Sequence, residues 1–196
     1  MAAGRPKAFD PDKALDCALK VFWQKGYEGA SLPDLTEAMG INRPSLYAQF
    51  GNKKQLFLKA IDRYIQGPAS PSAQAIAQPT ARKVVEALLF NGIKTVSNPR
   101  TPHGCLLVQG ALVCGDDAQD VCKELAKRRK AAITSLAERF EAAKVQGDLP
   151  AESDARTLAS YVMAVVFGMA VQATHGVSRQ DMTAVADWVL ASWPSK

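Results

Sequence analysis

Residues 42–53 gather side chains that could recognise a partner through hydrogen bonds and charge. Leu46 and Phe50 lie four residues apart, so a short helix over residues 43–50 would turn one apolar face inward. Its other face would present five further side chains, namely Arg43, Pro44, Ser45, Tyr47 and Gln49. A short exposed helix with hydrogen-bond donors near its N-terminus fits the major groove of DNA. We therefore expect this helix to read base edges.

Two lysines begin the next predicted helix, directly after Asn52 as its N-cap. Lys53 and Lys54 fall in the first turn, where the positive end of the helix dipole disfavours cations. A phosphate bound by the free amides of that turn, with a lysine beside it, would make this placement an anion site. The alternative is that both lysines simply point into water.

The elements that would position these side chains are two short helices and a tight turn within residues 31–57. Ser31, with Asp34 three residues later, is typical of a helix N-cap. Gly40 suits the end of this helix, because leaving a helix abruptly favours a positive φ. Asn42 would cap the second helix. The pattern predicts a helix-turn-helix.

This segment resembles the DNA-binding motif of the tetracycline-repressor family (TetR/AcrR-type) of bacterial transcriptional regulators. The resemblance rests on the segments 38–42, 46–50 and 52–53, within a stretch from Ala14 to Tyr64. It departs from the family pattern by mild polar exchanges at three positions, namely Asn42, Gln49 and Asn52.

The resemblance implies a role for individual side chains on double-stranded operator DNA. Arg43, Pro44 and Ser45 would face base edges, and Gln49 belongs to the same DNA-binding set. Ser31, Tyr47 and Lys53 would contact phosphates, which set affinity and register rather than sequence preference. Arg5, in the basic segment 4–7, would reach the minor groove, with an unstructured tail as the alternative.

The resemblance also implies how such a protein is regulated. It would be a ligand-responsive regulator, expected to be a repressor, that binds a palindromic operator as a homodimer and is released by an unknown small-molecule inducer. No cofactor is implied. The dimer would form through the last two helices, and the inducer would occupy a cavity among the middle helices. Our candidates for its lining are Phe90, Cys105, Leu106, Cys122, Met163 and Phe167.

Apolar spacings of three and four residues run through the whole chain, and they predict an all-α protein of about nine helices. We expect a helix-turn-helix DNA-binding domain over residues 1–66 and a helical effector-binding and dimerisation domain over 67–196. Beyond a loop at 67–79, helices are expected at about 80–97, 104–114, 118–146, 152–175 and 179–193. Residues 162–173 are apolar on nearly every side, more than one subunit's core should need.

Composition favours a protein of the cytoplasm with an anionic partner. The net charge is +5, and residues 1–65 carry 10 basic and 7 acidic side chains. We expect no exported form, because no signal-peptide pattern begins the chain, and no membrane helix, because the apolar run 158–173 is too short. No spacing typical of an enzyme or a metal site is present. The run 127–130 of four basic residues is expected to be a solvated surface.

The four cysteines are scattered without a Cys-x-x-Cys pair, and we expect all of them to be reduced thiols. Cys105 offers an alternative function, because His103-Gly104-Cys105 would open a helix. The helix dipole and the imidazole could then lower the thiol pKa and make Cys105 a sensor of oxidants or electrophiles.

Overall fold

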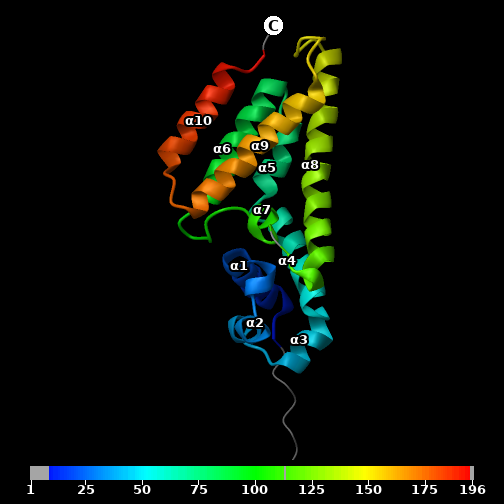
Figure 1. The fold of residues 1–196 in the computed structure, drawn as a ribbon, viewed down its shortest axis with the longest axis vertical. Helices are drawn as coiled ribbons and strands as arrows, with labels where there is room; N and C mark the ends of the chain where they lie inside the picture. Colours follow the sequence, from blue (N-terminus) through cyan, green and yellow to red (C-terminus); the bar gives the residue numbers. More distant parts are fainter. Residues whose placement is uncertain (1–8, 113, 195–196) are drawn as a thin grey trace, which may run out of the picture.

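The computed structural model describes residues 9–112 and 114–194, where all regular structure is helical (Figure 1). It confirms the predicted all-α class, with ten α-helices and two 3₁₀ turns in the described ranges. In chain order these are α1 (Pro11–Gly29), α2 (Leu32–Met39), α3 (Arg43–Phe50), α4 (Lys53–Gln66), α5 (Ser70–Gln74), η1 (Ala75–Ala77), α6 (Ala81–Val96), α7 (Leu106–Gln109), η2 (Asp116–Ala118), α8 (Gln119–Val145), α9 (Ala155–Thr174) and α10 (Arg179–Ala191).

Helices α1 to α4 form a small unit at one end of the elongated molecule (Figure 1). α1 packs against both α2 and α4. Two edge-to-face aromatic pairs join α1 to α4, with ring centroids 5.0 Å apart for Phe22 and Phe57 and 4.8 Å apart for Trp23 and Tyr64. Such pairs contribute about 0.5–1.5 kcal/mol each beyond the burial of their area. They fix the helix that follows α3 onto the rest of the unit.

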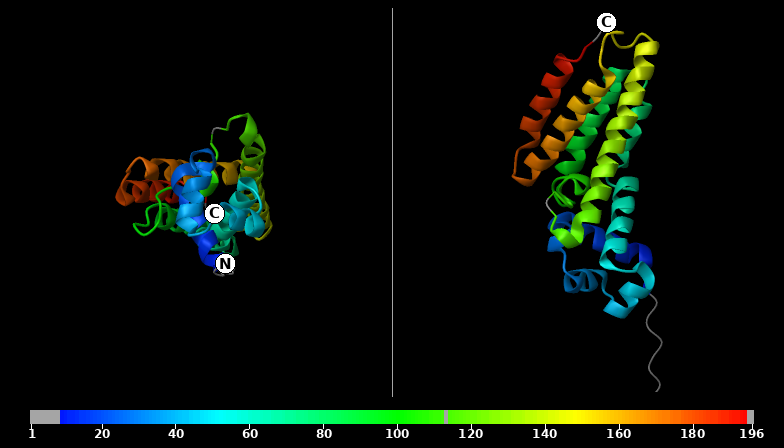
Figure 2. Two further views of the ribbon diagram at one scale, coloured as in Figure 1. Left: turned by 90° about the horizontal axis from the view of Figure 1, so that it is seen from below. Right: turned by 45° about the vertical axis from the view of Figure 1, so that its right-hand side comes forward.

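The second unit is a bundle of long helices, in which α9 packs against α8 and α6, and α10 packs against α6 (Figure 2). α8 has 27 residues, which corresponds to about 40 Å of helix. At the far end of the bundle the rings of Phe140 and Trp193 lie 5.3 Å apart. The bundle core is continuous and apolar, with no buried charged side chain among the described residues.

α7 joins the two units. Four buried residues from the second half of the chain belong to the core of the N-terminal unit, namely Leu106, Ala111, Val121 and Leu125. The amide of Tyr27 donates a hydrogen bond of 2.7 Å to the carbonyl of Gly110. This contact requires a kink in α1 at Gly26, whose φ is 69° and whose added Cβ would lie 3.3 Å from that carbonyl oxygen. Gly26 therefore kinks α1, which continues beyond it to Gly29.

Two predicted elements differ from the structure. The helix expected at 104–114 is a single turn, α7, because tertiary contacts take its backbone and side-chain groups: the Gln109 amide donates to the carbonyls of Trp23 and His103. The predicted loop at 67–79 contains the additional short helix α5, which packs against α6. Both differences arise from long-range contacts.

α9 is the one helix within the described ranges that is long and apolar enough to cross a membrane by length and composition. The run 158–173 was expected to be too short to cross a membrane, whereas the helix has 20 residues. Length and composition alone also describe the core helix of a soluble bundle, and α9 packs against α6 and α8. Only 33% of its apolar window is buried within the single subunit. The exposed large apolar side chains of α9 are Tyr161 and Val171.

Candidate nucleic-acid interface and internal cavity

The first half of the helix-turn-helix is held by local caps. The amide of Asp34 donates to the Ser31 hydroxyl oxygen at 3.2 Å, and the amide of Ser31 donates to Asp34 Oδ2 at 2.9 Å, so the predicted capping box is confirmed. The Ser31 hydroxyl in turn donates to Asp34 Oδ2 at 2.7 Å. Its single proton is therefore engaged within the protein. Any contact of Ser31 with a phosphate would compete with Asp34.

The turn and α3 have the predicted geometry. Gly40 adopts a left-handed conformation with φ 64° and ends α2, and Asn42 Oδ1 accepts a hydrogen bond from the amide of Ser45 at 2.9 Å. Leu46 and Phe50 are buried, as the sequence analysis expected.

The outward face of α3 carries the predicted recognition residues. Arg43, Pro44 and Gln49 are exposed, Ser45 is half-buried, and the side chain of Tyr47 is 48% exposed. α3 lies at the end of the molecule, away from the bundle (Figure 1). Arg5 lies outside the described residues. The exposed side chains therefore share one short helix at this end of the molecule, facing away from the bundle among the described residues.

Lys53, which the family resemblance singled out as a phosphate contact, and the neighbouring Lys54 have different environments. The ammonium of Lys53 lies 4.7 Å from the centre of the Tyr27 ring, and burial lowers its pKa, opposed by the carboxylates of Glu28 and Asp34. Lys54 instead forms an ion pair with Asp120 of α8, with 2.7 Å between Nζ and Oδ2. The attraction to the Tyr27 ring holds the ammonium group of Lys53 close to the N-terminal end of α4. Lys53 is therefore the better placed of the two for a phosphate.

A cavity of about 320 Å³ lies between α4, α5, α6, α8 and α9, with a mostly apolar wall. Three predicted lining residues border it: Cys105, Met163 and Phe167. The other three do not. Leu106 is fully buried in the N-terminal core, Phe90 packs against the bundle core, and Cys122 is bonded to Cys114. The reasons differ: the short α7 turns Leu106 into the N-terminal core, Phe90 faces another part of the bundle, and the disulfide holds Cys122.

Sequence reasoning also missed several residues that border the cavity. Tyr64 and Ile65 belong to α4, and Arg128 and Arg129 to α8. The run 127–130 was expected to be a solvated surface, but only Lys127 and Lys130 are exposed, whereas the two arginines are partly buried. The helical period of 3.6 residues places the two arginines on a different face from the two lysines. It does not indicate what the arginines contact.

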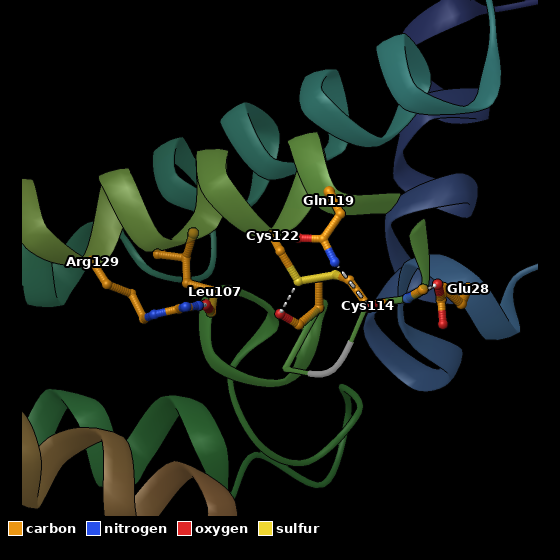
Figure 3. Close-up of a disulfide and its surroundings, with 8 residues drawn as sticks. Glu28, Leu107, Cys114, Gln119, Cys122 and Arg129 are labelled. Atoms are coloured by element: carbon orange, nitrogen blue, oxygen red, sulfur yellow. Dashed lines mark hydrogen bonds between the residues drawn. A yellow bond between two sulfur atoms is a disulfide. The ribbon is translucent and has the colours of Figure 1, made fainter. Parts of the chain in front are cut away.

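Two expectations about the cysteines are wrong. Cys114 and Cys122 form a disulfide (Figure 3), with 6.4 Å between their Cα atoms. Cys17 and Cys105 are free. Burial raises the pKa of Cys105, although the Tyr64 hydroxyl and nearby amides oppose the rise. The predicted lowering fails because α7 has only four residues and His103 is exposed, so the thiol meets the cavity wall instead of a long helix dipole.

The N-terminal unit matches the family model described as "Bacterial regulatory proteins, tetR family" over residues 14–60. The model described as "Tetracyclin repressor-like, C-terminal domain" matches residues 81–187, which is more than half of the chain. The chain belongs to the TetR family. The first match covers the helix-turn-helix and most of α4, and the second covers the bundle from α6 to α10.

Relatives of this TetR-family chain are similar over almost their whole length. The HTH-type transcriptional repressor ComR of Escherichia coli (strain K12) is 35% identical over 97% of this chain and 92% of its own. A solved structure of a cysteine-substituted TetR family transcriptional regulator CifR, in complex with 26-base-pair double-strand operator DNA, is 40% identical. The match covers 97% of this chain and 100% of the CifR chain, with a TM-score of 0.91. A putative TetR regulator from Rhodococcus sp. RHA1 is 39% identical over 93% of this chain and 98% of that one, with a TM-score of 0.64.

Three polar contacts tie the TetR-family helix-turn-helix unit to α8 and the residues before it. Besides Lys54 and Asp120, the guanidinium of Arg128 forms an ion pair with Asp62 of α4, and the amide of Gly115 donates to Glu28 Oε1 at 2.8 Å. The partners are separated by 66 or more residues, so no local pattern signals them. Because α4 borders the cavity near its C-terminus and begins at Lys53, it connects the cavity to the candidate DNA-binding surface.

Proposed function

We propose that this protein is a transcriptional repressor that binds a palindromic operator as a homodimer and is released by a small molecule. The observation that carries the proposal is the outward face of α3, whose exposed polar side chains stand on a helix fixed by Leu46 and Phe50. The relative named a repressor and the relative solved on operator DNA support it. An operator-binding repressor acts in the cytoplasm, which is where we place this chain.

On DNA, Arg43, Pro44 and Ser45 face base edges, and Gln49 extends from the same surface. The N-terminal position of the first three on α3 supports this assignment, because the start of a recognition helix lies deepest in the major groove. Tyr47 and Lys53 contact phosphates on either side, with Ser31 at the start of α2. In our proposal these contacts set affinity, while the base contacts set sequence preference.

The homodimer forms through α9 and α10. Apolar side chains on these helices remain exposed in the single subunit, namely Tyr161, Val171, Val185 and Trp188. The Trp188 side chain is 74% exposed, which is unusual for the largest apolar side chain in a folded domain. Gly168 of α9 has open space where a Cβ would be, so another helix can approach closely there. A two-fold pair of four helices would cover this face and place two α3 helices on one operator.

The inducer occupies the cavity and acts through α4. Tyr64 and Ile65 of this helix border the cavity, and Lys53 lies at its other end. A ligand that binds the DNA-incompetent arrangement more tightly shifts the population toward it and lowers operator affinity.

Sensing by Cys105 alone is the less favoured alternative, because its raised pKa leaves little thiolate. Mild oxidant treatment followed by mass spectrometry and an operator-release assay tests it. Release that persists in Cys105→Ser excludes Cys105 as the sensor.

Equilibrium binding to DNA that flanks the protein's own gene, measured at several salt concentrations, tests the proposed function. We expect two subunits per site, affinity well above that for unrelated DNA, and a steep fall with salt as phosphate contacts release counterions. Equal affinity for flanking and unrelated DNA would contradict a repressor. Binding with little salt dependence would instead indicate a protein-interaction module.

A further inference from the structure

Polar residues border the cavity at several places: Ser72, Thr95 and Ser135 lie on α5, α6 and α8, whereas Arg129 contacts α7 through the carbonyl of Leu107. Cys105 directly precedes Leu106, the first residue of α7, and Tyr64 of α4 and Arg129 of α8 border the cavity with it. Arg129 also donates a hydrogen bond of 2.6 Å from Nη1 to the carbonyl of Leu107, so its guanidinium lies against α7 (Figure 3). Most of the remaining wall consists of hydrocarbon side chains, including Leu88, Met163, Val166 and Phe167. The cavity therefore combines a few polar groups with a large apolar surface.

The two neighbouring arginines on this wall differ in their partners. Arg128 is neutralised by two carboxylates, Asp62 and Glu124. Arg129 is partly buried, and within the described ranges no carboxylate lies within 4.0 Å of it; its recorded partner is the uncharged carbonyl of Leu107. A guanidinium has five N–H donors, so most of its hydrogen-bonding capacity remains. A partly buried charge without a counter-charge is unfavourable, and an anion placed beside it relieves that cost.

We propose that the ligand of this cavity is a monocarboxylic acid whose carboxylate pairs with Arg129 and whose apolar body lies on the hydrocarbon wall. The proposal rests on the inducer role of the cavity given above and names the chemical class of the inducer. A planar guanidinium suits a carboxylate because two parallel N–H to oxygen hydrogen bonds can form. A ligand with one negative charge is favoured over a ligand with two, because Arg128 already pairs with Asp62 and Glu124 and only Arg129 of these two arginines is available.

The same pairing offers a path to the DNA-binding unit. A carboxylate that binds the free N–H groups of Arg129 pulls on the same guanidinium whose Nη1 donates to the Leu107 carbonyl of α7. α7 contacts α1 and α4, and Gly110 just after it accepts the hydrogen bond from Tyr27. An acid that draws the guanidinium away from Leu107 therefore loosens the element that joins the two units.

The test compares acids with matched alcohols on the DNA-free dimer. Hexanoate, octanoate, decanoate and cinnamate are titrated by calorimetry beside hexanol, octanol, decanol and cinnamyl alcohol. The proteins are the parent, Arg129→Met, Arg129→Lys and, as a control, Lys130→Met, which removes an exposed charge from the same helix. Thermal melting of each variant verifies folding.

In the parent, we expect at least one acid to bind roughly tenfold or more tightly than its alcohol, as a charge-assisted hydrogen-bonded pair allows. Arg129→Met abolishes this preference while the alcohol binds as before, Arg129→Lys keeps part of it, and Lys130→Met keeps all of it. A merely structural role for Arg129 would weaken acids and alcohols alike, and this result would overturn the proposal.

Equal binding of acids and alcohols by the parent, or no binding of any pair at millimolar concentration, also overturns it. Operator release is then measured with the acid that binds. If the acid binds through Arg129 and leaves operator affinity unchanged, the ligand class stands and the inducer role of the cavity fails.

Discussion

Lys54 of α4 and Asp120 of α8 form an ion pair, with 2.7 Å between Nζ and Oδ2, that joins the first turns of the two helices. The neighbouring Lys53 takes no part in this pair and lies over the ring of Tyr27. The pair lowers the pKa of Asp120. Lys54 therefore connects the two units of the chain, whereas Lys53 does not share this ion pair and is the lysine that we propose for the phosphate contact.

This division predicts unequal effects of removing the two lysines. Lys53→Ala should weaken binding to all DNA sequences and reduce the slope of log affinity against log salt by about one per subunit. Tyr47→Phe should also weaken binding to all sequences. Lys54→Ala should change the slope less and cost at most about 1 kcal/mol of stability, as expected for an exposed ion pair. Lys83→Ala, on α6 in the bundle, is the control. Equal slopes for Lys53→Ala and Lys54→Ala would contradict the assignment.

Residues at the start of α3 should control sequence preference instead. Arg43→Ala and Ser45→Ala should each reduce discrimination at particular base pairs, by about 1–3 kcal/mol for each lost base contact. Ser45→Ala leaves the helix cap intact, because Asn42 accepts from the Ser45 amide and not from its hydroxyl. A panel of operators with single base-pair changes measures the effect. If the variants retain the parent's ranking of the panel, α3 does not read bases through these residues.

The exposed apolar face of α9 and α10 should hold the dimer. Trp188→Ala should weaken self-association by roughly 2 kcal/mol or more, as for a buried aromatic hot spot. Gly168→Leu should also weaken self-association. It should not unfold the subunit, because the added side chain meets open space there. Val145→Ala on α8 is the control, since Val145 is 90% exposed but lies on another helix. Sedimentation equilibrium measures the dimer dissociation constant of each of these three variants. A dimer unaffected by Gly168→Leu would place the interface elsewhere.

Low pH should lower the stability of the helix-turn-helix unit, because Asp34 becomes protonated. Its pKa lies well below the usual range, first because Lys25 donates to its carboxylate and then because the amide and hydroxyl of Ser31 do. A lowered folded-state pKa stabilises the protein above the ordinary aspartate pKa of about 4, and this contribution is lost as pH falls toward the folded-state value. Thermal melting from pH 7 to 3 should show the parent losing its advantage over Asp34→Asn. A constant difference across this range would exclude the charge as the cause.

The disulfide should stabilise the start of α8. A loop of this length gives about 2.5 kcal/mol by the chain-entropy relation. Reduction should lower the melting temperature and speed amide exchange in residues 114–122, which include Gly115 bonded to Glu28. Cys122→Ser should not respond to reductant, whereas Cys17→Ser should respond like the parent. Exchange in this segment that is identical with and without reductant would contradict a stabilising disulfide.

Sequence reasoning succeeded where structure is set by neighbours along the chain. The caps at Ser31, Asn42 and Asn52 each bond a group three residues away, and Leu46 and Phe50 follow the helical period. These features define the helix-turn-helix, so most of the candidate DNA-binding surface could be predicted without a structure.

Sequence reasoning failed where distant residues decide the structure. The indole of Trp23 donates to the Gly104 carbonyl at 3.2 Å, 81 residues away, and Tyr27 takes the carbonyl of Gly110. These contacts limit α7 to one turn and change the direction of the side chains around it. The contact of Arg129 with the Leu107 carbonyl and the place of Cys105 on the cavity wall involve α7, and the pairing of Arg128 with Asp62 joins residues 66 apart, so none of the three has a local signal.

A nuclease footprint on the DNA flanking the protein's own gene tests the central claim most directly. We predict that the parent dimer protects a nearly palindromic site, with two half-sites about one helical turn apart. The double variant Arg43→Ala, Ser45→Ala should lose this footprint while keeping salt-dependent binding to unrelated DNA. Absence of any protected site with the parent, or the same footprint at the same concentration with the double variant, would contradict the account.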